Sequence, residues 1–190
     1  MNLKRLTFAA FTAASLLGTA AHAQPYIGLS IGQSSIDESI TEGLITSGTT
    51  DGKDSAFKLF GGYRFHPNFA AELAYVNLGE LTYSGTFFAT PVTGGSVKAN
   101  GLNMSAVGIL PLTNEFSLFG KLGLFAWEAK ASDTTGGVPF SATADGADVS
   151  FGIGASYDFT KQFSVRAEWE LFKLENADAS LVSVGVLFRF

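Results

Sequence analysis

The strongest constraint in the sequence is an alternation of apolar with small or polar residues that has a period of two. Between residues 26 and 32, Ile27, Leu29 and Ile31 share one face, and small or polar residues occupy the other. This alternation predicts a β-strand with one face in an apolar environment. The pattern returns in seven further segments, at residues 56–65, 69–75, 102–110, 116–124, 149–159, 163–171 and 182–190.

Short turns and long connections alternate between the predicted strands. The turns at 66–68, 111–115 and 160–162 are short, whereas the connections at 33–54, 78–97, 129–146 and 173–179 are long and polar. Transmembrane barrels show this asymmetry, although a soluble β-sandwich also has alternating strands. Asn100-Gly101 is a strong hairpin dipeptide, so either a long strand starts irregularly there or the second loop contains its own small hairpin.

The face opposite the apolar row is charged, which separates these two fold classes. A sandwich could not bury nine charges between its sheets, whereas five cations and four anions can pair inside a barrel. We therefore predict an all-β fold, an eight-stranded antiparallel up-and-down transmembrane β-barrel, whose narrow interior is filled by side chains. The expected lumen charge network consists of Lys58, Arg64, Glu72, Lys121, Asp158, Arg166, Glu168, Glu170 and Arg189.

Aromatic residues on the apolar face cluster near the short turns or the end of the last strand. They predict an aromatic girdle at a membrane interface. The girdle residues are Phe57, Phe65, Phe69, Phe116, Tyr157, Phe159, Phe163, Phe188 and Phe190. An even number of strands lets the last strand, with Val182, Val184, Val186, Phe188 and Phe190 on one face, close against the first.

The first 23 residues have the layout of a secretory signal peptide. Lys4 and Arg5 precede an apolar stretch, and Ala21-His22-Ala23 forms an A-x-A cleavage site before Gln24. Hydroxyl residues interrupt the apolar stretch, which disfavours a retained membrane helix. We expect a signal peptide at residues 1–23 and one barrel domain at residues 24–190.

Composition excludes several other functions. The net charge of −5 and the lack of a basic patch disfavour nucleic-acid binding, and the absence of cysteine excludes disulfides and thiolate metal sites. After signal cleavage, His66 is the one remaining histidine. It is expected in a short turn on the periplasmic side, whereas lipid A lies in the outer leaflet, so His66 is a poor candidate for the general base of a lipid-modifying enzyme. Glu168 and Glu170 lie beside Arg166, which favours ion pairing over acid–base catalysis. We expect no catalytic residue, metal or cofactor.

The sequence resembles the OmpA-like transmembrane domain and related small outer-membrane barrels in two segments and at its last residue. These are residues 57–65 (FKLFGGYRF), residues 67–73 (PNFAAEL) and Phe190. The resemblance implies a bacterial outer-membrane location, contact with outer-membrane lipid and lipopolysaccharide, and a monomeric state. It also implies that the barrel-insertion machinery reads Ser180 to Phe190. Family members pair interior charges to block or gate a channel. The family's periplasmic peptidoglycan-holding domain does not match any segment here, so cell-wall anchoring is not expected.

Function is then expected to reside in the long connections. The first is acidic, with Asp37, Glu38, Glu42, Asp51 and Asp54 against Lys53, and the third contains Asp133, Asp145 and Asp148. Such loops are either simply solvated or recognise a basic or cation-bridged partner on a host or cell surface. The expected function is structural and surface-interacting, without catalysis. A narrow or gated channel for small solutes is the alternative, and a lipid-modifying enzyme a more distant one.

Overall fold

The computed structural model describes residues 24–38, 48–50, 53–87, 90–135, 138–174 and 177–190. Every element in these ranges is a β-strand, and neighbouring strands are antiparallel. Within the same ranges, no helix is long and apolar enough to cross a membrane. The strands are β1 (Gln24–Glu38), β2 (Gly48–Thr50), β3 (Lys53–His66), β4 (Phe69–Phe87), β5 (Thr90–Pro111), β6 (Phe116–Thr135), β7 (Val138–Asp158), β8 (Phe163–Leu174) and β9 (Ala177–Arg189).

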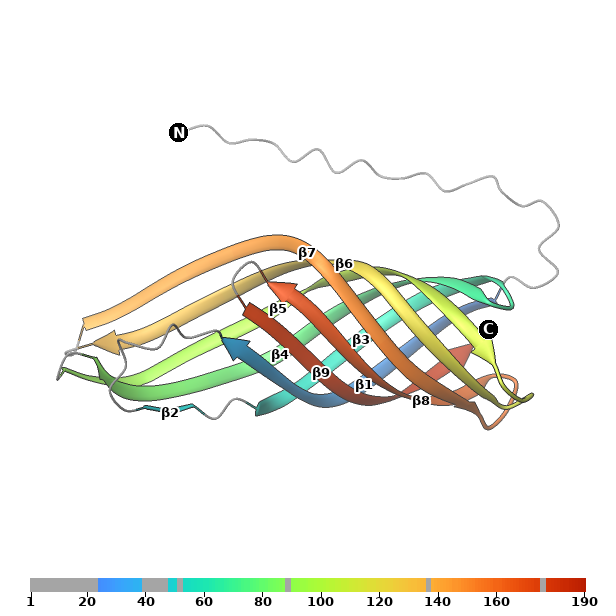
Figure 1. Ribbon diagram of the computed structural model, residues 1–190, viewed down its shortest axis with the longest axis horizontal. Coiled ribbons are helices and arrows are strands. Elements are labelled where there is room, and N and C mark those ends of the chain that lie inside the picture. Colours follow the sequence, from blue (N-terminus) through green and yellow to red (C-terminus); the bar gives the residue numbers. More distant parts are fainter. Residues whose placement is uncertain (1–23, 39–47, 51–52, 88–89, 136–137, 175–176) are drawn as a thin grey trace, which may run out of the picture.

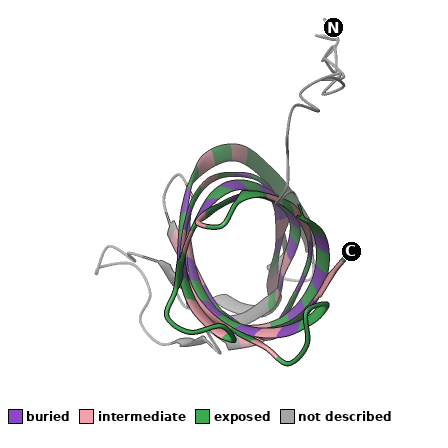
Figure 2. Cartoon of the chain, turned by 90° about the vertical axis from the view of Figure 1, so that its right-hand side faces the viewer, coloured by how far each residue is buried: buried purple, intermediate pink, exposed green. Residues whose placement is uncertain are grey.

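Eight of these strands form a closed barrel (Figures 1 and 2). The short β2 pairs only with the outer part of β4, and each other strand pairs with its neighbours in sequence. The ring closes where β9 pairs with β1, from Tyr26 opposite Arg189 to Glu38 opposite Ala177. The predicted eight-stranded antiparallel barrel is confirmed.

The period-two pattern corresponds to the two faces of the barrel wall. Large apolar side chains point outward and are exposed, for example Ile31 at 68% and Met104 at 64%. The alternate residues point into the lumen and are mostly buried. An exposed apolar belt around the whole barrel is what lipid contact requires. Of the predicted girdle, Phe57 is misplaced: it lies opposite Asn77, far from the short turn that follows β3.

The prediction of long loops at 78–97, 129–146 and 173–179 is wrong. β4 and β5 stay paired out to Phe87 opposite Thr90, and β6 and β7 out to Thr135 opposite Val138. Asn100-Gly101 therefore lies inside a continuous strand, opposite Asn77 and Val76, and the irregularity is a bulge on β4 before Glu80. Likewise, β8 and β9 leave only residues 175–176 between them. Residues 90–98 and 128–135 have no regular row of large apolar residues, so their strands were not recognisable from the sequence, whereas the alternation of Leu81, Tyr83 and Phe87 with polar residues was a signal that sequence reasoning missed.

Strands β4 to β7 extend beyond the rest of the barrel as two long hairpins (Figure 1). β5 has 22 residues and β7 has 21, whereas β8 has 12. A tilted strand needs only about 9 to 11 residues to cross a bilayer, so roughly half of each long strand projects past the membrane. We call the projecting part, residues 80–87, 90–98, 128–135 and 138–147, the hairpin wall.

Candidate functional site

The middle of the lumen holds a compact cluster of six ionised side chains from four strands. Three are cations and three are carboxylates, and each is at most 7% exposed. The members of this central cluster are Lys58 on β3, Glu72 on β4, Lys121 on β6, and Arg166, Glu168 and Glu170 on β8. The numbers of positive and negative charges are equal, which is the condition for burying ions at tolerable cost.

Every member of the central cluster contacts at least two partners of opposite charge. Lys121 Nζ lies 2.5 Å from Glu72 Oε1, 2.9 Å from Glu168 Oε2 and 3.4 Å from Glu170 Oε1. Arg166 lies 2.9 Å from Glu72 Oε2 and 3.1 Å from Glu168 Oε2. Lys58 pairs with both Glu168 and Glu170. Removing one member therefore leaves at least two others short of a partner.

A glycine on β7 allows residues from β6 and β8 to meet. Gly152 lies between Lys121 on one neighbouring strand and Glu170 on the other. A Cβ atom at this position would lie 3.1 Å from Glu170 Cγ and 3.4 Å from Lys121 Cβ. The missing side chain gives the two ionised groups room to reach each other across β7.

Aromatic rings enclose the cluster on its short-turn side. The Arg166 guanidinium carbon lies 4.6 Å from the centre of the Phe60 ring and 4.4 Å from that of Phe119, within cation–π range. The Tyr26 hydroxyl donates to Glu72 Oε2 at 3.1 Å. Sequence reasoning missed these three rings. The alternation could have revealed the two phenylalanines, because Phe60 is two residues from Lys58 and Phe119 is two residues from Lys121. Residues two apart in a strand point to the same face.

Toward the hairpin wall, the lumen contains a layer of aromatic and polar side chains. The rings of Phe125 and Phe172 lie 4.5 Å apart and are fully buried. Beside them, the Ser150 hydroxyl donates to Asn103 Oδ1 at 2.7 Å, and Trp127 Nε1 donates to Asp148 Oδ2 at 2.8 Å. The described lumen thus contains an ionic layer and, nearer the hairpin wall, a buried layer built around two aromatic rings.

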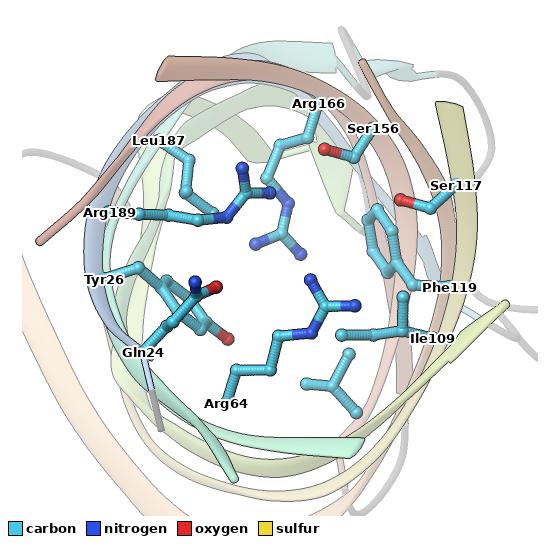
Figure 3. A pocket seen from close by; sticks show the side chains of 11 residues that line it. Gln24, Tyr26, Arg64, Ile109, Ser117, Phe119, Ser156, Arg166, Leu187 and Arg189 are labelled. Carbon is cyan, nitrogen blue, oxygen red and sulfur yellow. The ribbon is translucent and has the colours of Figure 1, made fainter. Parts of the chain in front are cut away.

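The other three predicted lumen charges lie apart from the central cluster, at the short-turn end. Arg189 Nη2 lies 2.9 Å from Asp158 Oδ1, which also accepts from the Ser164 hydroxyl at 2.7 Å. Arg64 donates to the carbonyl of Pro67. Between these residues and Arg166 is a cavity of about 50 Å³ (Figure 3). The nine charges expected to form one network therefore form two groups.

Comparison with known proteins agrees with this architecture. The profile of a family described as outer membrane protein beta-barrel domain matches residues 6–190. The chain belongs to this family. Its location is the bacterial outer membrane, in agreement with its relatives' names.

One relative, outer membrane protein A of Salmonella typhi, is 28% identical over 205 residues. The match covers 99% of this chain but only 56% of the relative, so the chain spans about half of that protein. Two solved structures share the fold. Ail of Yersinia pestis, in complex with the heparin analogue sucrose octasulfate, has a TM-score of 0.60 at 18% identity, over 88% of this chain and 99% of that one. Neisserial surface protein A has a TM-score of 0.57 at 17% identity, with the same coverage.

In this family member, the expected insertion signal lies on the strand that closes the barrel. Val182, Val184 and Val186 on β9 point outward, each 57–60% exposed. The Phe188 ring packs 5.0 Å from Phe163 and 5.1 Å from Phe190. Recognition of this row by insertion machinery stays a prediction, which outer-membrane assembly of a Phe190→Ala variant would check. Of the expected cleavage residues, Ala21 and Ala23 lie outside the described residues, and Gln24 begins β1.

The remaining candidate for chemistry, His66, was expected in a turn but is the exposed last residue of β3 and pairs with Phe69. Its Nδ1 accepts from the backbone N–H of Asn68 at 3.2 Å, and its ring lies 5.7 Å from that of Phe69. Among the described residues, no three His, Asp or Glu side chains are grouped so that they could hold a metal ion.

Proposed function

We propose that this barrel is a structural and surface-interacting protein of the outer membrane, without catalytic activity. The observation that carries the proposal is the combination of a lumen occupied by two layers with a hairpin wall that projects beyond the membrane. Because paired charges and aromatic rings occupy the interior of the barrel, a binding partner would contact its outer surface and the hairpin wall. In this proposal, His66 has a structural role at the end of β3, where its imidazole accepts a backbone hydrogen bond from the following turn.

The charge of the projecting surface favours a basic or cation-bridged partner. Glu80 and Lys98 pair at 3.1 Å and Glu128 and Lys130 at 2.9 Å, so these charges cancel. Hydrogen bonds from Lys98 and Ser96 lower the pKa of the Glu80 carboxyl, which is therefore ionised at neutral pH. In the sequence, the segments at residues 33–54 and 129–146 contain more acids, including Glu42, Asp51, Asp133 and Asp145, than lysines and arginines. Such a surface would repel a polysulfated ligand of the kind bound by Ail.

An oligolysine peptide should therefore bind the mature barrel in zwitterionic nanodiscs more tightly than a heparin fragment does. A variant with Glu42→Gln, Asp51→Asn, Asp133→Asn and Asp145→Asn should lose about fivefold or more in affinity, and wild-type binding should weaken as salt screens the charges. Surface plasmon resonance measures both. The matched control, Lys98→Gln with Lys130→Gln, should not weaken binding. Tighter binding of heparin would contradict this assignment.

A gated channel is the second candidate, because the central cluster has interchangeable partners. Lys121 contacts three carboxylates and Lys58 two, so a shift of either ammonium group exchanges one ion pair for another. The buried aromatic layer formed by Phe125 and Phe172 opposes conduction.

We expect no steady conductance from the wild-type barrel in planar bilayers, because both lumen layers are filled. A variant with Lys58→Ala, Glu168→Ala, Phe125→Ala and Phe172→Ala removes bulk from both layers and no net charge. It should show discrete conductance steps, and it serves as the control that the assay detects an open lumen. Stable open events in the wild-type protein would favour the channel instead.

In this proposal the barrel contacts the membrane on its outside and is a single copy. The outward apolar row contacts outer-membrane lipid, and the hairpin wall lies at the level of lipopolysaccharide. We propose a monomer, because pairing of β9 with β1 leaves no open barrel edge. Light scattering of the detergent-solubilised barrel should give the mass of one copy.

A further inference from the structure

The cavity at the short-turn end has an unusual chemical character: three guanidinium groups converge on it. Arg64 comes from β3, Arg166 from β8 and Arg189 from β9, and all three side chains point toward the middle of the lumen mouth (Figure 3). The hydroxyls of Ser156 on β7, which is paired with Arg166, and of Ser117 on β6 continue the lining beside Arg166. We call this group of five side chains the basic cup.

Counting the ion pairs shows that one positive charge in the basic cup is not neutralised. The six members of the central cluster balance, and Arg166 belongs to that cluster. Arg189 is balanced by Asp158 at 2.9 Å. Arg64 has no carboxylate within 4.0 Å among the described residues, and it donates a hydrogen bond to the carbonyl of Pro67.

Buried donors point to the same conclusion. The Nε atoms of Arg64 and Arg166 are both inaccessible to solvent and have no hydrogen-bond acceptor among the described residues. Arg166 as a whole is only 5% exposed. An unsatisfied donor on a buried charged group costs more than an ordinary lost hydrogen bond, so an acceptor in the cavity would stabilise the site.

We propose that the basic cup binds a small tetrahedral oxyanion of the phosphate class. Guanidinium groups offer paired donors that match phosphate oxygens, and the two serine hydroxyls beside Arg166 supply further donors. The single anionic charge compensates Arg64. The cavity of about 50 Å³ has room for a phosphate-sized group.

The acidic groups that face the basic cup are already engaged. Asp158 is held by Arg189 and by the Ser164 hydroxyl. Glu72 and Glu168 lie behind Arg166 and accept hydrogen bonds from its two terminal nitrogens. These carboxylates reduce the attraction for an anion without removing the excess charge on Arg64.

Two sources of phosphate reach this rim. Short turns of outer-membrane barrels face the periplasm. The cup is therefore open both to free phosphate in the periplasm and to phosphate headgroups of lipids in the adjacent leaflet. A lipid would enter by its headgroup alone, because the cavity lies inside the barrel.

The test is a titration of the mature barrel in a phosphate-free maltoside detergent, followed through the arginine Nε–Hε signals in NMR spectra. Inorganic phosphate is the first probe, and glycerophosphoethanolamine, a soluble lipid headgroup, is the second, both at constant ionic strength. We expect saturable shifts of Arg64 and Arg166 with at least one probe. Stronger binding of the headgroup would assign the lipid source, and stronger binding of inorganic phosphate the free one.

Arg64→Gln should weaken binding about tenfold or more, because it removes the uncompensated charge and the donor fork. Arg64→Lys should recover part of the affinity, since it restores the charge without the fork. The control Lys98→Gln, at the opposite end of the molecule, should bind like the wild type. Non-saturating shifts that are the same in Arg64→Gln and wild type would overturn the proposal.

Discussion

Glu72→Ala is expected to lower the free energy of unfolding by about 3 to 5 kcal/mol, because it removes one partner from each of two buried cations and leaves the cluster with one uncompensated positive charge. The carboxylate contacts Lys121 at 2.5 Å and Arg166 at 2.9 Å, and it also accepts from the Tyr26 hydroxyl at 3.1 Å. Lys121→Ala should have a loss of similar size, since three carboxylates lose a counterion. Urea-induced unfolding from lipid vesicles, followed by tryptophan fluorescence, measures both variants.

The matched control is Glu80→Ala on the same strand. Glu80 also pairs with a lysine, Lys98, at 3.1 Å, but both side chains are exposed. Exposed ion pairs contribute little because water and salt screen them. We expect an unchanged unfolding midpoint for this variant. If Glu72→Ala and Lys121→Ala behaved in the same way as the control, the central cluster would not stabilise the barrel.

Phe60→Ala is expected to destabilise the barrel by an amount comparable to Glu72→Ala, about 3 to 5 kcal/mol. The ring is 1% exposed and lies against all three cations of the central cluster, with the Arg166 guanidinium carbon 4.6 Å from its centre. Its removal opens a cavity and also takes one aromatic contact from each of the three cations. The same urea titration measures the loss.

Leu59→Ala is the comparison for Phe60→Ala, because the neighbouring residue points to lipid and is 49% exposed. Lipid chains can occupy the space that the leucine leaves, so the expected loss is clearly smaller. Phe60→Leu should lie between the two, since it fills part of the cavity but cannot make a cation–π contact. Equal losses for Phe60→Ala and Leu59→Ala would mean that the lumen is not packed around this ring.

Local sequence predicted which side chains face the lumen, and this part of the site was predictable. Lys58, Glu72 and Lys121 were assigned to the inward face from their place in the alternation, and all three are buried there. The same rule also assigned the outward row of β9. Strand ends were less predictable. Residues 128–135 continue their strand without any large apolar residue, so the alternation that marks the lipid-facing part of the strand is absent there.

Sequence alone determined the two faces of the barrel wall, because side-chain direction in a strand alternates by local geometry and needs no knowledge of neighbours. Only the tertiary structure decided which charges meet. Lys58 and Glu168 are 110 residues apart, and their contact depends on closure of the barrel and on the register between strands. The same closure balances six charges in the centre and brings Arg64 to the rim without a carboxylate of its own. Which ions pair across the lumen depends on the closed ring of strands and cannot be derived from the sequence of any single strand.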